Sequence, residues 1–387
     1  MANPIPSRLL PDNTSIDENG SGSIAGCNLV ELAEEYGTPL FVYDENHLRA
    51  RCREAVKAFG EGVAYAGKAF LCGAMSRLVV EEGMNIDVAT GGELYMALHA
   101  GIDGSRLIMH GNNKSESELR MALEAGVSRI VVDSFDELDR LQILHKETGI
   151  SPKILLRITP GVEAHTHEFI STGQDDSKFG FTVSTGMALE AVERAVKTEA
   201  VELVGIHAHI GSQVFKVDSF IRAVEVMAEF SNPLELPELS IGGGLGVSYL
   251  EDDHAPSITE WGEAVQTACM QTGIKAKVTA EPGRAIAAAA AITLYRIGTI
   301  KELEGLRTYV AVDGGMSDNP RPVLYGSGYE TFLPRSMNKK RDRSIRMVGK
   351  HCESGDLLVR EGWIPSDVAT ISWPNGNFSR NRHRSLL

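Results

Sequence analysis

Hydrophobic and polar positions follow one recurring pattern over most of the chain. From about residue 62, a short β-branched or apolar run, a polar or glycine-containing turn and an amphipathic segment rich in Ala, Leu and Glu follow one another repeatedly. Short apolar runs predict buried strands, and apolar positions at helical spacing predict helices. The eight predicted strands are 63–69, 84–89, 106–110, 128–133, 153–159, 203–210, 239–244 and 277–281.

Strands that alternate with helices indicate parallel βαβ units and an α/β fold. Eight such units over about 220 residues fit a (β/α)8 TIM barrel, which typically needs about 250. We therefore expect a barrel over residues 46–284. An open doubly wound sheet is the alternative that the same pattern allows.

The remaining residues show a different alternation. Residues 290–313 and 344–363 alternate apolar and polar positions without intervening helices, which is typical of antiparallel strands. Residues 1–45 are expected to add a strand or two. The sequence thus predicts a mostly antiparallel β domain from 1–45 and 285–387, with an irregular tail from about residue 370.

Composition narrows the class of protein. The chain has 387 residues, of which 43% are hydrophobic and 23% charged, so it can bury the cores of two domains. No apolar stretch approaches the roughly 18 to 20 residues that cross a bilayer, and the N-terminus lacks the pattern of a secretory signal. A net charge of −14 argues against nucleic-acid or anionic-membrane surfaces and favours small molecules or further copies of the chain as partners.

The five cysteines bear on the compartment. Their number is odd and none shows CxxC spacing. This use of cysteine favours reduced thiols and a cytoplasmic protein over a disulfide framework.

Chemically active side chains gather at the predicted strand ends, where barrels of this type place their active sites. Lys68 follows a run of small apolar residues, and Glu281 ends the eighth predicted strand. Asp87 lies in the second strand, where on its own it would more often cap the following helix. His207 and His209 share one predicted strand face, but no carboxylate or third histidine recurs nearby at ligand spacing, so no metal site is predicted.

Two glycine-containing segments suggest a phosphate. The segments GGGLG after the seventh strand and EPGR after the eighth bring backbone N–H groups to the end of a barrel where phosphate sites commonly form. Combined with Lys68 and Glu281, they predict pyridoxal 5'-phosphate (PLP). The lysine would form a Schiff base, the N–H groups would hold the phosphate, and the carboxylate would pair with the pyridine nitrogen.

Six motifs then occur in a specific order between about residues 25 and 369. They are YAGKAF, HAHIGSQ, GGGLG, EPGR, DNPRPVLY and CESGD. In this order and spacing the chain resembles the alanine-racemase-type (fold III) PLP-dependent decarboxylases. The resemblance implies a barrel with a C-terminal β domain, and a homodimer whose active sites are shared. It is strongest to the members acting on diaminopimelate, and so implies decarboxylation of meso-2,6-diaminopimelate to L-lysine and CO2 in lysine biosynthesis.

The resemblance also assigns roles to residues. Lys68 would be the Schiff-base lysine, His209 would stack on the ring, Glu281 would pair with the pyridine nitrogen, and Cys352 would protonate the α-carbon. The implied cofactor-binding set is Lys68, Asp87, His209, Ser212, Gly243, Gly244, Glu281, Gly283 and Arg284.

Substrate choice has a physical basis as well. Diaminopimelate carries a second carboxylate, and a guanidinium group can bind a carboxylate through two hydrogen bonds. Arg321 and Tyr325 in DNPRPVLY, together with Arg284, are the expected carboxylate partners. Glu353 would take the distal ammonium group.

The chain departs from the family after GWIPSDVA. Family members continue through further strands and a motif with Gly, Ala and Tyr, whereas this chain ends within eighteen residues. We therefore expect a shortened β domain, a weaker dimer and reduced activity. The alternatives are a PLP-binding paralogue that acts as a non-enzymatic binding protein, and a decarboxylase for another basic amino acid. An amino-acid racemase is disfavoured, because racemases of this fold use a tyrosine as second base in a different context.

Overall fold

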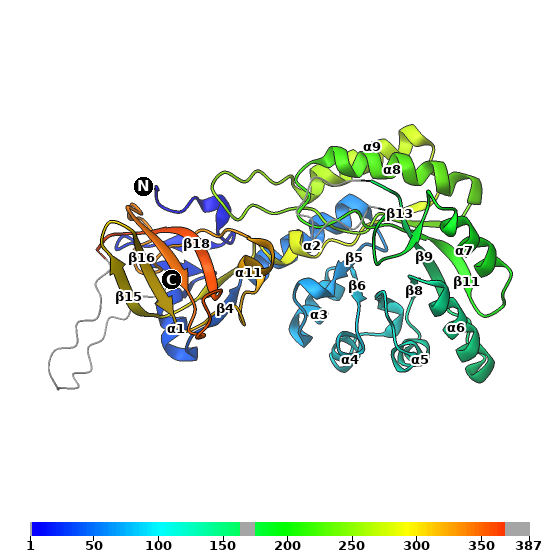
Figure 1. Cartoon of the computed structure of the whole chain (residues 1–387), viewed down its shortest axis with the longest axis horizontal. Coiled ribbons are helices and arrows are strands. Elements are labelled where there is room, and N and C mark those ends of the chain that lie inside the picture. The colour runs from blue at the N-terminus through cyan, green and yellow to red at the C-terminus, as the bar shows by residue number, and fades with distance from the viewer. Residues whose placement is uncertain (1, 163–174, 368–387) are drawn as a thin grey trace. The chain divides into compact units, whose positions relative to one another are not determined.

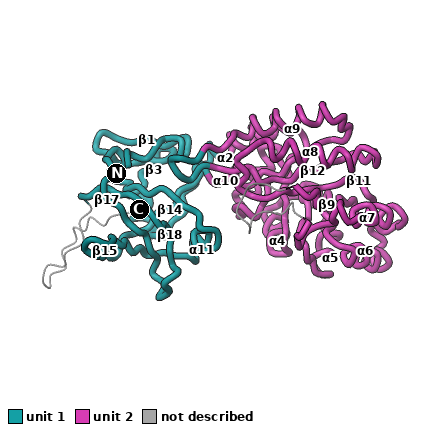
Figure 2. Tube along the Cα trace, turned by 45° about the horizontal axis from the view of Figure 1, so that its top comes forward, with its two compact units in different colours: residues 1–48, 248–253, 289–387 teal, residues 49–247, 254–288 magenta. Residues whose placement is uncertain are grey.

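A computed structural model describes residues 2–162 and 175–367 (Figure 1). The chain divides into two compact units (Figure 2). Unit 1 consists of residues 1–48, 248–253 and 289–387, and unit 2 consists of residues 49–247 and 254–288. The predicted irregular tail from about residue 370 lies outside the described residues.

Unit 2 is built on eight parallel strands that follow one another in sequence order around the sheet. A short further strand, β10 (Phe181–Thr182), pairs with β9. The eight strands are β5 (Ala64–Ala66), β6 (Asn85–Val88), β7 (Leu107–Met109), β8 (Arg129–Val132), β9 (Lys153–Thr159), β11 (Glu202–His207), β12 (Glu238–Ser240) and β13 (Lys277–Thr279).

The sheet closes on itself. Next to β5 and β13, the amide of Ala64 donates to the carbonyl of Ala280 at 3.0 Å, and the amide of Ala66 donates to that of Pro282 at 3.3 Å. Closure confirms the predicted (β/α)8 barrel and excludes the open sheet. One residue each from β5, β7, β8, β9 and β11 contributes to a buried apolar cluster, so the barrel contains a packed core.

Helices surround the strands in Figure 1. Several begin at a side-chain cap and end at a glycine in the left-handed conformation, as in α5, which runs from the capping box of Ser115 to Gly126 at φ 66°. The helices are α2 (Glu45–Phe59), α3 (Gly73–Glu81), α4 (Gly91–His99), α5 (Glu116–Ala125), α6 (Phe135–Thr148), α7 (Met187–Val196), α8 (Val217–Ser231), α9 (Ile258–Thr272) and α10 (Arg284–Ala287).

Unit 1 is mostly β structure, as predicted. Its largest sheet has the order β15-β16-β17-β18, with antiparallel outer pairs and a parallel central pair. The parallel pair differs from a simple meander because α11 and a long connection lie between β16 and β17. The elements are β14 (Ala291–Leu294), β15 (Ile297–Leu303), β16 (Arg307–Val312), α11 (Arg321–Tyr325), β17 (Arg343–Val348) and β18 (Leu357–Ile364).

The N-terminal segment holds more strands than the one or two expected. Three form a small sheet, and β4 pairs antiparallel with β14. These elements are β1 (Thr14–Ile16), β2 (Gly22–Ile24), β3 (Cys27–Asn28), α1 (Leu29–Tyr36) and β4 (Leu40–Tyr43). They were missed because strands of two to four residues leave almost no periodicity in the sequence.

Two further findings concern the whole described chain. Among the described residues, no helix has the length and apolar character needed to cross a membrane. All five cysteines are free thiols.

A buried ion pair ties three elements of the barrel together. Lys114 Nζ lies 2.6 Å from Glu137 Oε1 in α6, and both residues are 2% exposed. The same ammonium donates to the carbonyls of Gly111, after β7, at 2.8 Å and of Val131, in β8, at 2.7 Å. Because the Lys114 ammonium satisfies all three groups, removing it leaves an uncompensated buried carboxylate.

We expect Lys114→Met to lower the free energy of unfolding by about 3–5 kcal/mol, the usual cost of breaking a buried pair. Adding Glu137→Gln removes the orphaned charge and keeps an acceptor for the amide of Asp133, so the double variant should regain most of the loss. Urea denaturation measures both. Lys197→Met, which breaks the exposed pair with Glu193, serves as control and should change little. A single variant as stable as this control would contradict the expectation.

Candidate active site

Lys68 lies just past the end of the first barrel strand. The predicted strand 63–69 was too long: β5 ends at Ala66, and Lys68 sits in a single 3-10 turn, Gly67–Ala69. The turn packs close to the next strand, since a Cβ on Gly67 would lie 2.7 Å from the carbonyl of Asp87. Lys68 therefore does not share the strand alternation of Ala64 and Ala66, although it does stand at the carboxyl end of the barrel.

Lys68 as a whole is exposed, but its ammonium group is closely surrounded by protein atoms. Burial of the ammonium and the nearby Arg157 guanidinium lower the pKa of Lys68, against the opposing charges of Glu281 and Asp87. A lowered pKa raises the fraction of neutral amine, which is the nucleophilic form.

Glu281 is the centre of a buried polar network. His207 Nε2 donates to Glu281 Oε2 at 3.0 Å, and Ser240 Oγ donates to Glu281 Oε1 at 2.6 Å. Burial alone would raise the pKa of Glu281, but its electrostatic interactions with His207 and His110 and these hydrogen bonds outweigh burial and hold the pKa well below its usual value. Glu281 is thus an ionised carboxylate in a buried site.

Asp87 and His110 lie beside this network. His110 Nε2 is 3.4 Å from Asp87 Oδ1 and 4.0 Å from Glu281 Oε1. Burial and the charge of Glu281 raise the pKa of Asp87 well above its usual value, and burial lowers the pKa of His110 to about 3. Among the described residues, neither Asp87 Oδ1 nor His110 Nε2 has a hydrogen-bond partner. Such buried unpaired atoms fit a site that is completed by a bound polar group.

No carboxylate lies near His207 in the sequence, but Glu281 lies near it in the folded structure. His110, His207 and Glu281 offer ligand atoms that lie within 4.8 Å of one another. The residues come from the ends of β7, β11 and β13, which lie far apart in the sequence, so spacing along the chain could not show this group. The expectation of no metal stays a prediction.

His209 and the glycine segment are joined directly. The amide of Gly243 donates to His209 Nδ1 at 3.2 Å, so the imidazole proton resides on Nε2. Burial and the charge of Lys68 hold the pKa of His209 well below its usual value. A neutral, half-buried imidazole suits stacking on a ring face.

Close approach explains the glycines. A Cβ on Gly243 would lie 2.2 Å from the carbonyl of Glu281, and one on Gly244 would lie 2.1 Å from the carbonyl of Gly211. Gly244 also has φ 113°, which residues with a Cβ rarely adopt. The backbones of three neighbouring loops are therefore brought together at this end of the barrel.

A cation and a hydroxyl meet beside these loops. Arg284 Nη2 donates to Ser212 Oγ at 3.2 Å. Gly283 precedes Arg284, and its missing Cβ lets the turn approach Ala66, whose Cβ and carbonyl oxygen would lie 2.9 and 3.0 Å away. A guanidinium, a hydroxyl and glycine-rich backbone form a suitable set of groups for a phosphate.

The four remaining predicted residues belong to unit 1. In α11, Arg321 Nη2 donates to Ser327 Oγ at 3.3 Å, and the guanidinium carbon lies 5.2 Å from the centre of the Tyr325 ring. Cys352 and Glu353 are exposed in the connection between β17 and β18. The structure thus leaves the cysteine and the carboxylate accessible on a loop.

That loop is held by a buried carboxylate that the sequence analysis did not single out. Asp356 is 2% exposed and accepts hydrogen bonds from the amides of Met316 at 2.6 Å and His351 at 2.9 Å. Ser317 Oγ lies 3.0 Å from His351 Nε2 and adds a second link between the two loops. The position of Cys352 therefore depends on Asp356.

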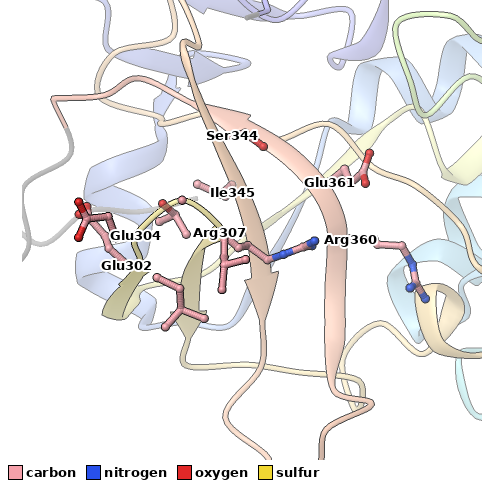
Figure 3. Close-up of a pocket in the computed structure, with 11 residues that line it drawn as sticks. Glu302, Glu304, Arg307, Ser344, Ile345, Arg360 and Glu361 are labelled. Carbon is pink, nitrogen blue, oxygen red and sulfur yellow. The ribbon is translucent and has the colours of Figure 1, made fainter.

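Unit 1 also has a hollow on its four-stranded sheet (Figure 3). The hairpin of β15 and β16 forms one side, with Glu302, Glu304 and Arg307, and β18 contributes Arg360 and Glu361. It contains none of the residues predicted from the sequence.

His110, His207 and Ser240 are not among the site residues predicted from the sequence. All three stand at or directly after the carboxyl ends of the observed strands β7, β11 and β12. The predicted strands 203–210 and 239–244 ran past His207 and Ser240, so of the three only His110 stood at a predicted strand end. The sequence did not show which residues they contact. His207 and Ser240 bond to Glu281, and His110 lies beside Asp87 and Glu281, all from distant parts of the chain.

A lysine with a lowered pKa, an ionised buried carboxylate and a glycine-rich loop beside Arg284 all stand at the carboxyl end of one barrel. These are the groups that define a PLP-dependent enzyme. Residues 45–288 match the family described as "Pyridoxal-dependent decarboxylase, pyridoxal binding domain".

Comparison with known proteins narrows the family. The chain is 48% identical over 379 residues to the diaminopimelate decarboxylase of Mycobacterium tuberculosis strain H37Rv, covering 92% of this chain and 85% of that protein. It is 44% identical to that of Bacillus subtilis strain 168, covering 90% and 83%. The crystal structure of the M. jannaschii diaminopimelate decarboxylase in complex with L-lysine is 30% identical, with a TM-score of 0.85 and coverage of 97% and 86%. The chain belongs to the diaminopimelate decarboxylase branch of the pyridoxal-dependent decarboxylases.

The buried, neutral His110 should make stability depend on pH. Its pKa is about 3 in the folded protein against 6.5 ordinarily, so below pH 6.5 the unfolded chain takes up a proton that the folded protein does not. The contribution of His110 to stability should therefore be complete above pH 6.5 and fall as the pH drops toward about 3.

We expect His110→Gln to lose less stability than the unchanged protein on acidification from pH 7 to about 4.5, by this linkage. Urea denaturation at several pH values measures the slopes. His254→Gln, at an exposed position, is the matched control. Equal slopes for His110→Gln and the unchanged protein would show that His110 is protonated normally in the fold.

Proposed function

We propose that this protein catalyses PLP-dependent decarboxylation of meso-2,6-diaminopimelate to L-lysine and CO2. The observation that carries the proposal is the pairing at one barrel end of Lys68, whose pKa is lowered, with Glu281, which stays ionised. The similarity to diaminopimelate decarboxylases over nine-tenths of the chain supports the substrate.

Lys68 would hold the cofactor covalently, because its lowered pKa favours the neutral amine that reacts with an aldehyde. Arg284, Ser212 and the backbone of Gly243 and Gly244 hold the phosphate. When bound, PLP supplies an electron sink for the electron pair that remains as CO2 departs.

Glu281 keeps a proton on the ring nitrogen. Its negative charge is fixed by His207 and Ser240, so the carboxylate stabilises a protonated nitrogen without itself taking the proton. His209 stacks on the ring face in its neutral form. Asp87 lies beside the same network, and burial and the charge of Glu281 raise its pKa.

Unit 1 supplies further groups for the substrate, three for its far end and one for the reacting carbon. Arg321 and Tyr325 bind the distal carboxylate, Glu353 binds the distal ammonium, and Cys352 donates the proton that replaces the departing CO2. We propose that these residues act in a homodimer with shared active sites. A cytoplasmic location stays a prediction from the use of cysteine.

The direct test is CO2 release from meso-diaminopimelate with added PLP, against lysine, ornithine and arginine as competing substrates. We expect release from diaminopimelate alone. Preference for ornithine or arginine would favour another basic amino-acid decarboxylase. PLP binding without any release would favour the non-enzymatic alternative.

Lys68→Ala should abolish covalent cofactor attachment, because the variant lacks the amine that reacts with the aldehyde. The unchanged protein should show the visible absorbance band of attached PLP, and borohydride should fix the cofactor on the peptide that contains Lys68. Mass spectrometry identifies that peptide. Lys197→Ala, at an exposed position, should behave like the unchanged protein. A persisting band in Lys68→Ala would refute the assignment.

Arg321→Lys should weaken the use of diaminopimelate. Lysine keeps the charge but loses the planar pair of donors, so kcat/KM should fall by an amount equivalent to roughly 1–3 kcal/mol. Steady-state kinetics measure this, and Arg346→Lys in β17 is the control. Unchanged kinetics in Arg321→Lys would remove Arg321 from the substrate site.

A further inference from the structure

Two loops at the carboxyl end of the barrel are bound to each other by their backbones. One loop follows β11 and contains Val214, and the other follows β12 and contains Gly244 and Gly246. The amide of Val214 donates to the carbonyl of Gly244, and the amide of Gly246 donates to the carbonyl of Val214, both at 2.9 Å. The loops therefore run alongside each other as a short parallel bridge.

The side chain of Gln213 extends this bridge. Its Nε2 donates to the carbonyl of Val247 at 2.8 Å, and its Oε1 accepts from the amide of Val247 at 3.1 Å. The carboxamide thus pairs with both polar groups of one residue, as a neighbouring peptide would in a sheet. Val247 is 8% exposed, so without Gln213 its backbone groups would lack a partner in a largely buried place.

The backbone of Gln213 is in an unusual conformation. Its φ is 60°, in the left-handed region that a residue with a Cβ seldom occupies. A conformation of this kind persists only where the surrounding contacts hold it. The two side-chain bonds to Val247 and the backbone bonds of Val214 are such contacts.

The clamped loops carry the groups assigned to the phosphate. Ser212, which binds Arg284, directly precedes Gln213. Gly243 and Gly244 lie within the other loop, and a Cβ on Gly244 would lie 2.1 Å from the carbonyl of Gly211. Because the two loops are in such close contact, a small movement of one away from the other would move the Ser212 hydroxyl away from the backbone of Gly243 and Gly244.

We propose that Gln213 is a positioning residue for the cofactor phosphate. It does not contact the phosphate itself, but holds the Ser212 loop against the glycine loop so that both meet the same anion. This inference rests on the proposed PLP-dependent function. It predicts an effect specific to the phosphate group, which a general loss of stability would not produce.

The test compares two ligands that differ only in the phosphate. Apo-protein is titrated with PLP and with pyridoxal, both followed by the absorbance of the Lys68-attached form. Gln213→Ala removes both side-chain bonds, and Gln213→Gly removes them while relieving the left-handed backbone. Gln266→Ala, which removes a glutamine bonded to Ala58 elsewhere in unit 2, is the matched control.

We expect the Kd for PLP to rise at least about tenfold in both Gln213 variants, which corresponds to about 1.4 kcal/mol. The Kd for pyridoxal should change less than about twofold, which is a smaller effect than the loss of one hydrogen bond to the ligand would have. Thermal unfolding confirms that each variant is folded, and Gln213→Gly is the variant that carries no backbone strain.

Three outcomes would overturn the proposal. Equal weakening of PLP and pyridoxal in folded Gln213→Gly would show a general structural role. Unchanged affinities in both variants would show that the clamp is dispensable. Failure of the unchanged protein to bind PLP would overturn the proposed function, and this inference with it, whereas the first two outcomes leave that function intact.

Discussion

Closure of the barrel between β5 and β13 is the constraint on which the candidate site depends. The amide of Ala66 reaches the carbonyl of Pro282, and the missing Cβ of Gly283 allows that approach. Closure brings Lys68, in the turn after the first strand, near enough to Glu281, which follows the last strand, for their charges to interact. In an open sheet the amine and the carboxylate would lie at opposite edges, too far apart for the charge of one to affect the pKa of the other.

The electrostatics of the site follow from this crowding. Three carboxylate or imidazole groups next to one another cannot all be charged in a buried place, since each charge loses its hydration. Glu281 is the group that stays ionised, because His207 and Ser240 hydrogen-bond to it. Asp87 and His110 respond in the opposite sense, with pKa values shifted toward their neutral forms. A single fixed negative charge of this kind would stabilise a protonated pyridine nitrogen of PLP.

The loops that follow the barrel strands meet a second constraint. Their backbones touch directly, with no side chain between them. Gly243 and Gly244 allow the loop after β12 to touch its neighbours on both sides. The carboxamide of Gln213 then continues the backbone bridge at Val247. The same principle recurs in unit 1, where the carboxylate of Asp356 fills the space that a Cβ on Gly315 or Gly349 would occupy.

The sequence by itself determined the barrel, its eight strands in their correct order and the β domain, and it marked Lys68 and Glu281 as candidate site residues. Each of these leaves a local trace: period two or period 3.6 in the apolar positions, or a polar residue at the end of an apolar run. Only the tertiary structure decided that Lys68 lies in a turn beyond β5, that His110 and His207 join Glu281, and that Gln213 clamps Val247. These facts depend on pairings between residues far apart in the chain, and on the desolvation that follows when they meet. No local pattern records either.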